Sequence, residues 1–417
     1  MRISTTPFRV NGVQYRPPAK PLAVVCIDGC GPEYLKVSRN RGRMPHLDGL
    51  AEAGFETVVR GALPSFTNVN NACIVSGVPP SVTGISGNFF LDPRTGRELM
   101  MNSSRYVRCD TILAAASRAG RKVAMVTAKE KLRDLLTKDL DGIAFSSERA
   151  AAATVGTHGI GNLEDLVGRP QPEIYSAGAS LFVLAAGVRL VQRKLADFLF
   201  LSLTDYMQHK FPPESDQSLD FHQALDREIG ALLETGARVG VTADHGMNAK
   251  TGPGGSPNVV YLESLLRDRF GEGNRVVCPI TDPYVVHHGS LGSAVMVHVA
   301  EPAETTSVAA WIRRLPGIDE VYDRTAASRE LDLPADRIGD LVVMADAGAV
   351  IGKTPADHDL SVLNEPLRSH GGRHEVMVPM LLSEPLSGEY ESRAAQGARN
   401  YEIFDYLCNG VQSPIAG

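Results

Sequence analysis

Residues Ala237-Arg-Val-Gly-Val-Thr-Ala-Asp-His-Gly-Met247 contain a short apolar run that ends in an Asp-His-Gly turn. A Val-rich run of this length, bounded by a glycine turn, is typical of a buried β-strand. The carboxylate of Asp244 and the imidazole of His245 therefore stand together where a strand ends. This pair of ligand types suits zinc or a similar transition metal better than calcium. The alternative is an aspartate that caps the next segment beside a surface histidine.

Two other predicted strands also end at an aspartate. The apolar run 22–27 precedes Asp28, and the run 198–203 precedes Thr204 and Asp205. Apolar strands that alternate with helices predict an α/β fold with a doubly wound, mainly parallel sheet. Ligands of such sheets bind beyond the carboxyl ends of the strands, so these aspartates are expected at one functional edge. Helices are predicted at 44–54, 111–119, 150–153, 180–196 and 219–233, further strands at 122–127 and 376–382, and a loop at 81–88.

The pattern changes after Gly246. Residues 251–257 form a connector rich in glycine and proline, and a mixed set of short elements follows it. We expect strands at 294–299, 318–322 and 340–344 and a helix at 305–314. The chain is therefore predicted to have a core of residues 1–250 and 362–417 with a small α+β cap inserted as residues 251–361.

The composition is that of a globular protein. The chain has 417 residues, of which 43% are hydrophobic and 22% charged, and its net charge is −6. This charge argues against a nucleic-acid partner or an anionic membrane surface. The sequence shows no bilayer-spanning apolar run and no signal-peptide pattern, and its six cysteines lack the spacing of a disulfide framework. We expect a cytoplasmic protein, a monomer or homodimer, with a small-molecule partner.

The histidines complete two candidate metal-binding sets. Asp205 and His209 are four residues apart, so on one helical turn they share a face and can bind one cation together. Their third ligand is predicted to be His370, in a glycine-rich turn ahead of a strand, with His374 as the second choice. Asp28, Asp244 and His245 form the other set.

A hydroxyl nucleophile is predicted at Thr67, in the polar turn 63–71. Two metal ions about 4 Å apart clamp the attacking and leaving oxygens of a phosphoryl transfer. A hydroxyl bound to one of them loses its proton readily and becomes a nucleophile. Each of these seven residues alone fits a capped turn or a surface charge. Their shared placement at strand ends and polar turns favours a dinuclear centre.

Seven segments, in this order, resemble the alkaline phosphatase superfamily. The threonine is similar to that of its nucleotide pyrophosphatase/phosphodiesterase branch, whereas sulfatases use a modified Cys or Ser. Residues 127–133, 282–289 and 369–372 are similar to the phosphonoacetate hydrolases of that branch. The segments are Asp28-Gly29, Met44-Pro-His-Leu-Asp48, Pro64-Ser-Phe-Thr67, Gly77-Val-Pro-Pro-Ser-Val-Thr-Gly84, Thr204-Asp-Tyr-Met-Gln-His209, Ala243-Asp-His-Gly-Met247 and Ser369-His-Gly-Gly372.

The resemblance implies a di-zinc enzyme, with Mn²⁺ or iron as possible substitutes. One ion is expected on Asp205, His209 and His370, and the other on Asp28, Thr67, Asp244 and His245. The implied reaction is hydrolysis of the C–P bond of phosphonoacetate to acetate and phosphate through a phosphothreonine.

Three further residues are expected to bind this substrate. The resemblance implies that Asn88 donates to a phosphonyl oxygen; otherwise it is a turn residue. Lys129 and Lys131 follow a strand end and are candidates to hold the carboxylate, because the leaving carbanion spreads its charge into an enediolate that cations stabilise. The alternative for the lysines is a solvated pair at a helix start.

Other functions share these ligands. The main rival is a phosphodiesterase or nucleotide pyrophosphatase with the same centre, which would need an aromatic slot for a base. A phosphomonoesterase, a phosphomutase and a metal-stabilised binding protein without catalysis are the remaining alternatives. We do not expect His287, His288, the Asp357-His358-Asp359 string, Lys210 or Trp311 to take part in the chemistry.

Overall fold

The computed structural model describes residues 3–252, 254–280, 290–363 and 365–412. Its centre is a seven-stranded sheet in which β19 alone runs against its neighbours, so the sheet is mainly parallel, as predicted from the sequence. In spatial order the strands are β4 (Phe55–Arg60), β19 (Met377–Leu382), β10 (Arg238–Thr242), β3 (Leu22–Cys26), β9 (Phe198–Ser202), β7 (Val123–Thr127) and β8 (Ile143–Ser146).

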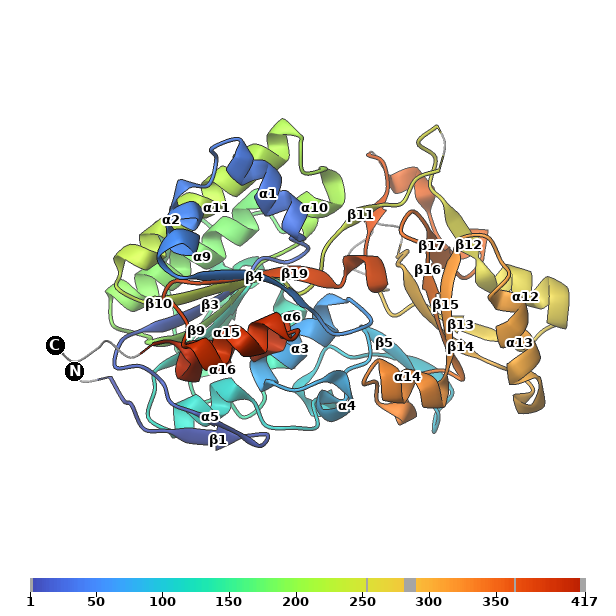
Figure 1. Cartoon of the computed structure of the whole chain (residues 1–417), viewed down its shortest axis with the longest axis horizontal. Coiled ribbons are helices and arrows are strands. Elements are labelled where there is room, and N and C mark those ends of the chain that lie inside the picture. Colours follow the sequence, from blue (N-terminus) through green and yellow to red (C-terminus); the bar gives the residue numbers. More distant parts are fainter. Residues whose placement is uncertain (1–2, 253, 281–289, 364, 413–417) are drawn as a thin grey trace.

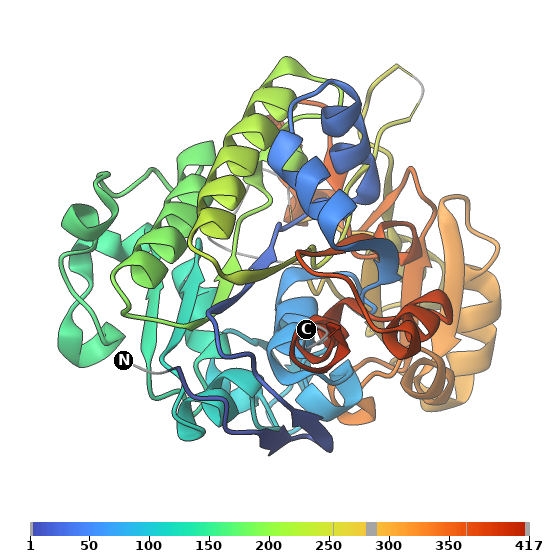
Figure 2. The same cartoon turned by 60° about the vertical axis from the view of Figure 1, so that its left-hand side comes forward.

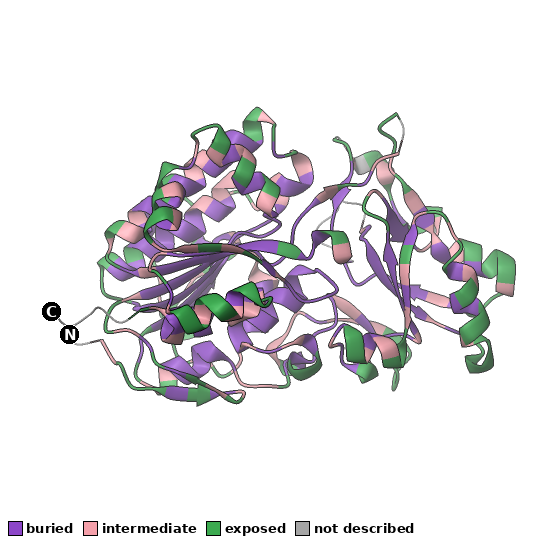
Figure 3. Cartoon of the chain, viewed as in Figure 1, coloured by how far each residue is buried: buried purple, intermediate pink, exposed green. Residues whose placement is uncertain are grey.

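Helices cover both faces of this sheet (Figure 1). The central strands β3, β7 and β9 are buried at every residue, which explains their continuous apolar runs. Figure 2 shows α1, α2 and α11 side by side, and Figure 3 shows their buried sides turned toward the strands. One face carries α1 (Pro32–Asn40), α2 (Pro45–Ala53), α9 (Ala177–Gln192) and α11 (Asp216–Glu234). The other carries α3 (Thr67–Ser76), α5 (Ile112–Arg118), α6 (Glu130–Leu136), α15 (Gly388–Ala395) and α16 (Ile403–Asp405).

Residues 262–280 and 290–345 form a second layer (Figure 1). Its antiparallel sheet has the order β13 (Arg275–Val277), β14 (Ala294–His298), β16 (Leu341–Ala345), β15 (Ile318–Asp323). The two faces of β14 differ, since Ala294 and Met296 join the main core while Val295 and Val297 pack in a separate cluster with α12 (Leu262–Phe270) and α13 (Thr305–Ile312). Helix α14 (Arg324–Glu330) follows β15. That residues 251–361 act as a separate cap stays a prediction.

Several local expectations were wrong. The polar turn 63–71 becomes the start of α3, and the predicted loop 81–88 overlaps the one-turn helix α4 (Pro80–Thr83). The predicted helix 150–153 is part of a 3₁₀ segment, Ser147–Ala152. The sequence analysis also missed the edge strand β4, whose alternating exposure gives no continuous apolar run, and the hairpin of β5 (Phe89–Asp92) and β6 (Arg97–Met100). No described helix is both long and apolar enough to cross a bilayer.

Candidate active site

Three aspartates converge because three adjacent parallel strands end at one edge. Asp28, Asp205 and Asp244 each follow the last residue of β3, β9 or β10 by two or three positions. All three are buried. Together with three histidines they form two groups, and the ligand atoms within each group lie within 4.8 Å of one another. The site therefore has the place that the fold gives to ligands.

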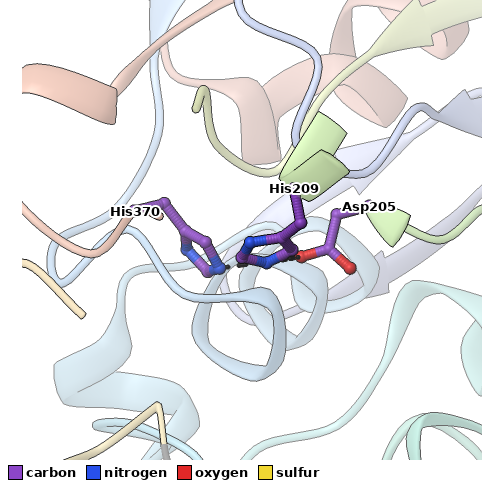
Figure 4. A group of neighbouring side chains, drawn as sticks. All are labelled: Asp205, His209 and His370. Atoms are coloured by element: carbon purple, nitrogen blue, oxygen red, sulfur yellow. Dashed lines mark ion pairs between the residues drawn. The ribbon is translucent and has the colours of Figure 1, made fainter. Parts of the chain in front are cut away.

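The first group contains Asp205, His209 and His370 (Figure 4). Asp205 precedes α10 (Tyr206–Lys210), and its Oδ2 lies 3.0 Å from His209 Nε2 and 3.6 Å from His370 Nε2. Each imidazole donates its Nδ1–H to a backbone carbonyl: His209 to Arg368 O at 2.8 Å and His370 to Ser65 O at 2.7 Å. These bonds fix the tautomers, so both Nε2 lone pairs face the carboxylate.

The second group contains Asp28, Asp244 and His245. His245 donates its Nδ1–H to Gly246 O at 2.9 Å, and its Nε2 lies 3.3 Å from Asp28 Oδ1 and 3.6 Å from Asp244 Oδ2. Asp244 Oδ1 accepts from the backbone N–H of Gly29 and of His245. Both carboxylate oxygens of Asp28 are buried without a hydrogen-bond donor among the described residues. A buried carboxylate in this state calls for a cation.

The two groups touch. The rings of His245 and His370 stack with centroids 3.6 Å apart and an angle of 7° between their planes. Lys129 spans the groups, since its Nζ lies 2.9 Å from Asp205 Oδ1 and 3.6 Å from Asp28 Oδ2. Any cations held by the two groups would therefore be close neighbours, as a dinuclear centre requires.

Burial and mutual repulsion shape the proton affinities of the site. Burial, and then the charges of Asp205 and Asp244, raise the pKa of Asp28 to about 7. Burial opposes ionisation of Asp205, yet Lys129 and His209 hold its pKa well below the usual range. Burial also opposes protonation of His245, but Asp244 and Asp28 raise its pKa to about 9. These carboxylates need positive charge between them.

The donor set fits two transition-metal ions. Three carboxylates and three imidazoles with fixed tautomers are the ligand types that Zn²⁺ takes. Their Nε2 atoms face carboxylate oxygens at 3.0–3.6 Å, and such an arrangement is attractive only when a metal ion or a proton lies between the atoms. Lys129 and a protonated His245 are the positive charges that the side chains themselves offer to the three carboxylates. The residues thus fit the implied ions, whose chemical identity the donor set alone leaves open.

Thr67 lies beside the second group. It is the first residue of α3, it is 9% exposed, and its Oγ1 lies 3.3 Å from His245 Nε2. The N-terminus of a helix presents unpaired N–H groups that favour an anion. The hydroxyl therefore has a candidate metal group on one side and an anion-binding helix end behind it.

Comparison with known proteins agrees with this geometry. A model of the type I phosphodiesterase/nucleotide pyrophosphatase family matches residues 22–373. Two crystal structures of phosphonoacetate hydrolase from Sinorhizobium meliloti 1021, in complex with phosphonoformate and with phosphonoacetate, are each 42% identical to the chain. Each match covers 97% of this chain and 99% of that chain, with a TM-score of 0.92. The chain belongs to the phosphonoacetate hydrolases of this family. It is a hydrolase, and the family resemblance drawn from its motifs is confirmed.

A more distant likeness concerns the fold alone. Murine ectonucleotide pyrophosphatase/phosphodiesterase 5 is 16% identical over 95% of this chain and 97% of that chain, with a TM-score of 0.60. It shares the architecture that places strand ends around the site. It carries no argument about the substrate.

In this hydrolase the two predicted substrate lysines adjoin the site, whereas Asn88 is linked to it through its backbone. Met101 links Asn88 to α3. The backbone O of Asn88 accepts from Met101 N at 2.7 Å, and Met101 O accepts from Asn68 Nδ2 of that helix at 2.8 Å. Lys129 and Lys131 line a pocket of about 470 Å³ together with Thr204, Tyr175 and Tyr206. The roles assigned to these residues remain predictions.

The two lysines differ in charge. The carboxylates of Asp205 and Asp28 outweigh burial and hold the pKa of Lys129 above its usual value. Burial, and then the neighbouring charge of Lys129, lower the pKa of Lys131 to about 7. Near neutral pH Lys131 therefore gains from an anion in the pocket, which would raise its pKa again.

Among the residues that the structure describes, no other histidine joins either group. His374 lies at the surface with its Nε2 3.1 Å from Asp319 Oδ2, so His370 is the residue that the fold turns toward Asp205. His358 accepts from the backbone N–H of Lys353, while its neighbours Asp357 and Asp359 accept from backbone N–H groups of their own turns. His287, His288 and the segment 282–289 lie outside the described residues.

Sequence reasoning missed the residues that hold the ligands. Asn71 donates to Asp244 Oδ2 at 3.1 Å and to Thr67 O at 3.0 Å, and its Oδ1 accepts from Ser202 Oγ at 2.8 Å. Lys250 and Glu375 form a fully buried ion pair near the His245 and His370 segments. The available signal for Asn71 was the three asparagines just ahead of the apolar run 72–75, a stretch that the structure buries throughout. Buried amides need specific partners.

Proposed function

We propose that this enzyme hydrolyses the C–P bond of phosphonoacetate to give acetate and phosphate. The observation that carries the proposal is the 42% identity, over 97% of the chain, to a phosphonoacetate hydrolase whose structure contains phosphonoacetate. The site agrees, since it offers a hydroxyl beside candidate metal groups and two lysines at an adjoining pocket.

The two buried groups would hold two zinc ions, or Mn²⁺ or iron in their place. Asp205, His209 and His370 would bind one ion, and Asp28, Asp244, His245 and the Thr67 hydroxyl the other. When bound, such ions lower the pKa of the hydroxyl and stabilise charge that develops on the phosphonyl oxygens. The remaining steps are proposed to depend on the side chains of the protein.

Thr67 is the proposed nucleophile. Its Oγ1 gives up a proton to water and attacks phosphorus, so that an O–P bond forms as the P–C bond breaks. The electron pair of the P–C bond leaves with the α-carbon of acetate. The N–H groups at the start of α3 face the phosphonyl oxygens, and Asn88 donates to one of them.

The leaving group is a carbanion adjacent to a carboxylate. Its charge spreads into an enediolate, and Lys129 and Lys131 are proposed to pair with the carboxylate as this charge grows. The α-carbon then takes a proton from water to give acetate. A second water attacks phosphorus of the phosphothreonine, the P–Oγ1 bond breaks, and phosphate and the free hydroxyl are released.

We also propose that residues 251–361 act as a cap over the site and that the enzyme works in the cytoplasm. Residues of the inserted segment adjoin the ligand loops, since Ser293 N donates to His370 O at 2.8 Å. All six cysteines are unpaired, which suits a reducing compartment.

The test is phosphate release from phosphonoacetate by zinc-loaded enzyme, measured beside p-nitrophenyl phosphate and a nucleotide diester. Strong turnover of phosphonoacetate that is lost in Lys131→Ala would support the proposal. Lys131 is the sharper variant, because Lys129 also neutralises two predicted metal ligands. Phosphonoacetate left intact by fully zinc-loaded enzyme would refute it.

A phosphodiesterase or nucleotide pyrophosphatase is the second candidate function. The rings of Tyr175 and Tyr206 lie 5.9 Å apart at the same pocket, so an aromatic surface does adjoin the centre. A nucleobase would stack there. Turnover of the diester alone, reduced by Tyr175→Ala, would favour this function over C–P hydrolysis.

A further inference from the structure

A buried ion pair lies behind the candidate metal centre. The side chains of Lys250 and Glu375 are both 0% exposed, and Nζ lies 2.8 Å from Oε1. Neither belongs to a candidate metal group, and the proposed reaction uses neither of them. Burial of two full charges is costly, and well-packed apolar side chains of similar volume often serve stability as well or better. A contribution to the stability of the fold therefore does not by itself explain why this pair is present.

Glu375 connects the segments that carry the two stacked histidines. Its Oε2 accepts from the N–H of Gly372, two residues beyond His370, at 3.0 Å. Its Oε1 accepts from Asn248 Nδ2 at 2.7 Å as well as from Lys250, and both donors follow His245. Its backbone carbonyl accepts from Gly246 N at 2.7 Å. One side chain thus bridges the loop of the first metal group to the loop of the second.

A short strand pair makes the same connection. β11 (Asn248–Ala249) pairs antiparallel with β18 (Arg368–Ser369), and in Figure 1 it lies between the two layers of the molecule. Two hydrogen-bonded residues on each strand are a weak restraint. The Lys250–Glu375 pair lies at the end of this ladder and adds charge-assisted bonds, which are stronger than neutral ones.

Lys250 also reaches the inserted segment. Its Nζ donates to Ala347 O at 2.8 Å, and Ala347 lies between β16 and β17 (Val350–Gly352). The backbone of Lys250 is anchored to the ligand loops, since its N–H donates to Leu367 O at 2.8 Å. A shift of residues 346–349 would therefore act on the ammonium and, through Glu375, on both loops.

We propose that Lys250 and Glu375 are a positioning pair that sets the spacing of the two metal groups and ties this spacing to the inserted segment. The inference rests on the dinuclear centre of the proposed function. It predicts that removal of the pair changes the metal centre more than it changes the stability of the fold. Residues that hold metal ligands in place typically contribute about 10–100-fold to metal affinity or activity.

The test compares a neutral double variant with the wild type. Lys250→Met/Glu375→Gln removes both charges at nearly constant volume, so neither charge is left unpaired. Zn²⁺ affinity is measured by competition with a chromophoric chelator, and the coupling between two bound Mn²⁺ ions by electron paramagnetic resonance. We expect unfolding at a urea concentration close to that of the wild type, weaker binding of the second ion by about 10–100-fold, and altered coupling.

Arg373→Gln is the matched control. Arg373 lies in the same 3₁₀ turn as Glu375, and its Nε pairs with Glu320 Oε2 at 2.7 Å. The two side chains of this pair are 35% and 26% exposed, whereas those of Lys250 and Glu375 are fully buried. Its removal should leave metal affinity and coupling unchanged. A double variant that binds both ions with wild-type affinity and coupling would overturn the proposal.

If the double variant does not fold, Asn248→Ala removes one bond to Glu375 Oε1 and a longer one to His374 O. It should weaken binding of the second ion by a smaller factor, and unchanged affinity would again overturn the proposal. The metal titration does not depend on the substrate. Failure of wild-type enzyme to cleave phosphonoacetate would therefore refute the proposed function without deciding the role of the pair.

Discussion

Asn71 offers the sharpest single-residue test of how the site is held together. Its amide is buried and bonds to the Asp244 carboxylate, to the carbonyl of Thr67 and to the Ser202 hydroxyl. The side chain therefore fixes one predicted metal ligand relative to the helix turn that carries the predicted nucleophile. Asn71→Ala removes all three bonds and adds none.

The expected magnitude follows from these contacts. The substitution leaves the Ser202 hydroxyl and one oxygen of Asp244 without a partner, at about 1–3 kcal/mol for each buried group. Part of the effect on Asp244 appears as lost metal affinity, about 10–100-fold, which corresponds to about 1.4–2.7 kcal/mol. Asn71→Asp should weaken zinc further at neutral pH, because a second carboxylate would face Asp244 Oδ2 at the 3.1 Å of the present bond.

The assay is zinc affinity by chelator competition, with urea unfolding of the metal-free protein as the measure of stability. Asn70→Ala is the matched control, since Asn70 is the preceding buried residue and bonds to Ala62 N at 2.7 Å and Ala62 O at 3.1 Å. We expect both variants to lose stability but only Asn71→Ala to lose zinc affinity. Wild-type affinity in Asn71→Ala would show that Asp244 is oriented without the amide.

Three other changes have defined outcomes. Thr67→Ala should abolish phosphate release while zinc content stays near that of the wild type; retained turnover would exclude Thr67 as the nucleophile. Gly371→Ala should weaken zinc binding and lower the melting temperature, because Gly371 has φ +123° and an added Cβ would lie 2.4 Å from Cε1 of Phe66, beside His370; equal values for variant and wild type would contradict this. His222 is neutral in the fold, since burial lowers its pKa from 6.5 to about 4 even though a hydrogen bond to Ser218 O opposes the shift. The unfolded chain therefore binds the extra proton as pH falls from 6.5 toward 4, and stability on the order of 3 kcal/mol is lost. Urea unfolding at pH 7 and 4.5 should show a steeper loss for wild type than for His222→Gln, and parallel losses would refute the assignment.

The fold class and most of the site followed from local patterns. Asp28, Asp205 and Asp244 could be placed together because the carboxyl ends of parallel strands meet at one edge, whatever the order of the strands. His209 could be paired with Asp205 because four residues make about one helical turn. Such relations depend on period and chain direction, which a sequence shows directly.

Other features depended on contacts between distant segments. The sequence favoured His370 over His374 by its glycine-rich turn, but it is the packing of that turn against Ser65 that directs the first toward Asp205 and leaves the second at the surface. The start of α3 was read as a turn because Thr and Asn are poor helix formers. In the structure its buried amides are satisfied by partners such as Ser202, 131 positions away along the chain.

By itself, then, the sequence determined the alternation of strands and helices, the residues at the strand ends and the family they resemble. The tertiary structure alone decided the reversed direction of β19, the stacking of His245 on His370 and the burial of Lys250 against Glu375. The reason is physical. Backbone periodicity and strand ends are properties of neighbouring residues, whereas the partner of a buried charge or amide is chosen by whichever distant segment the packed core brings within hydrogen-bonding distance.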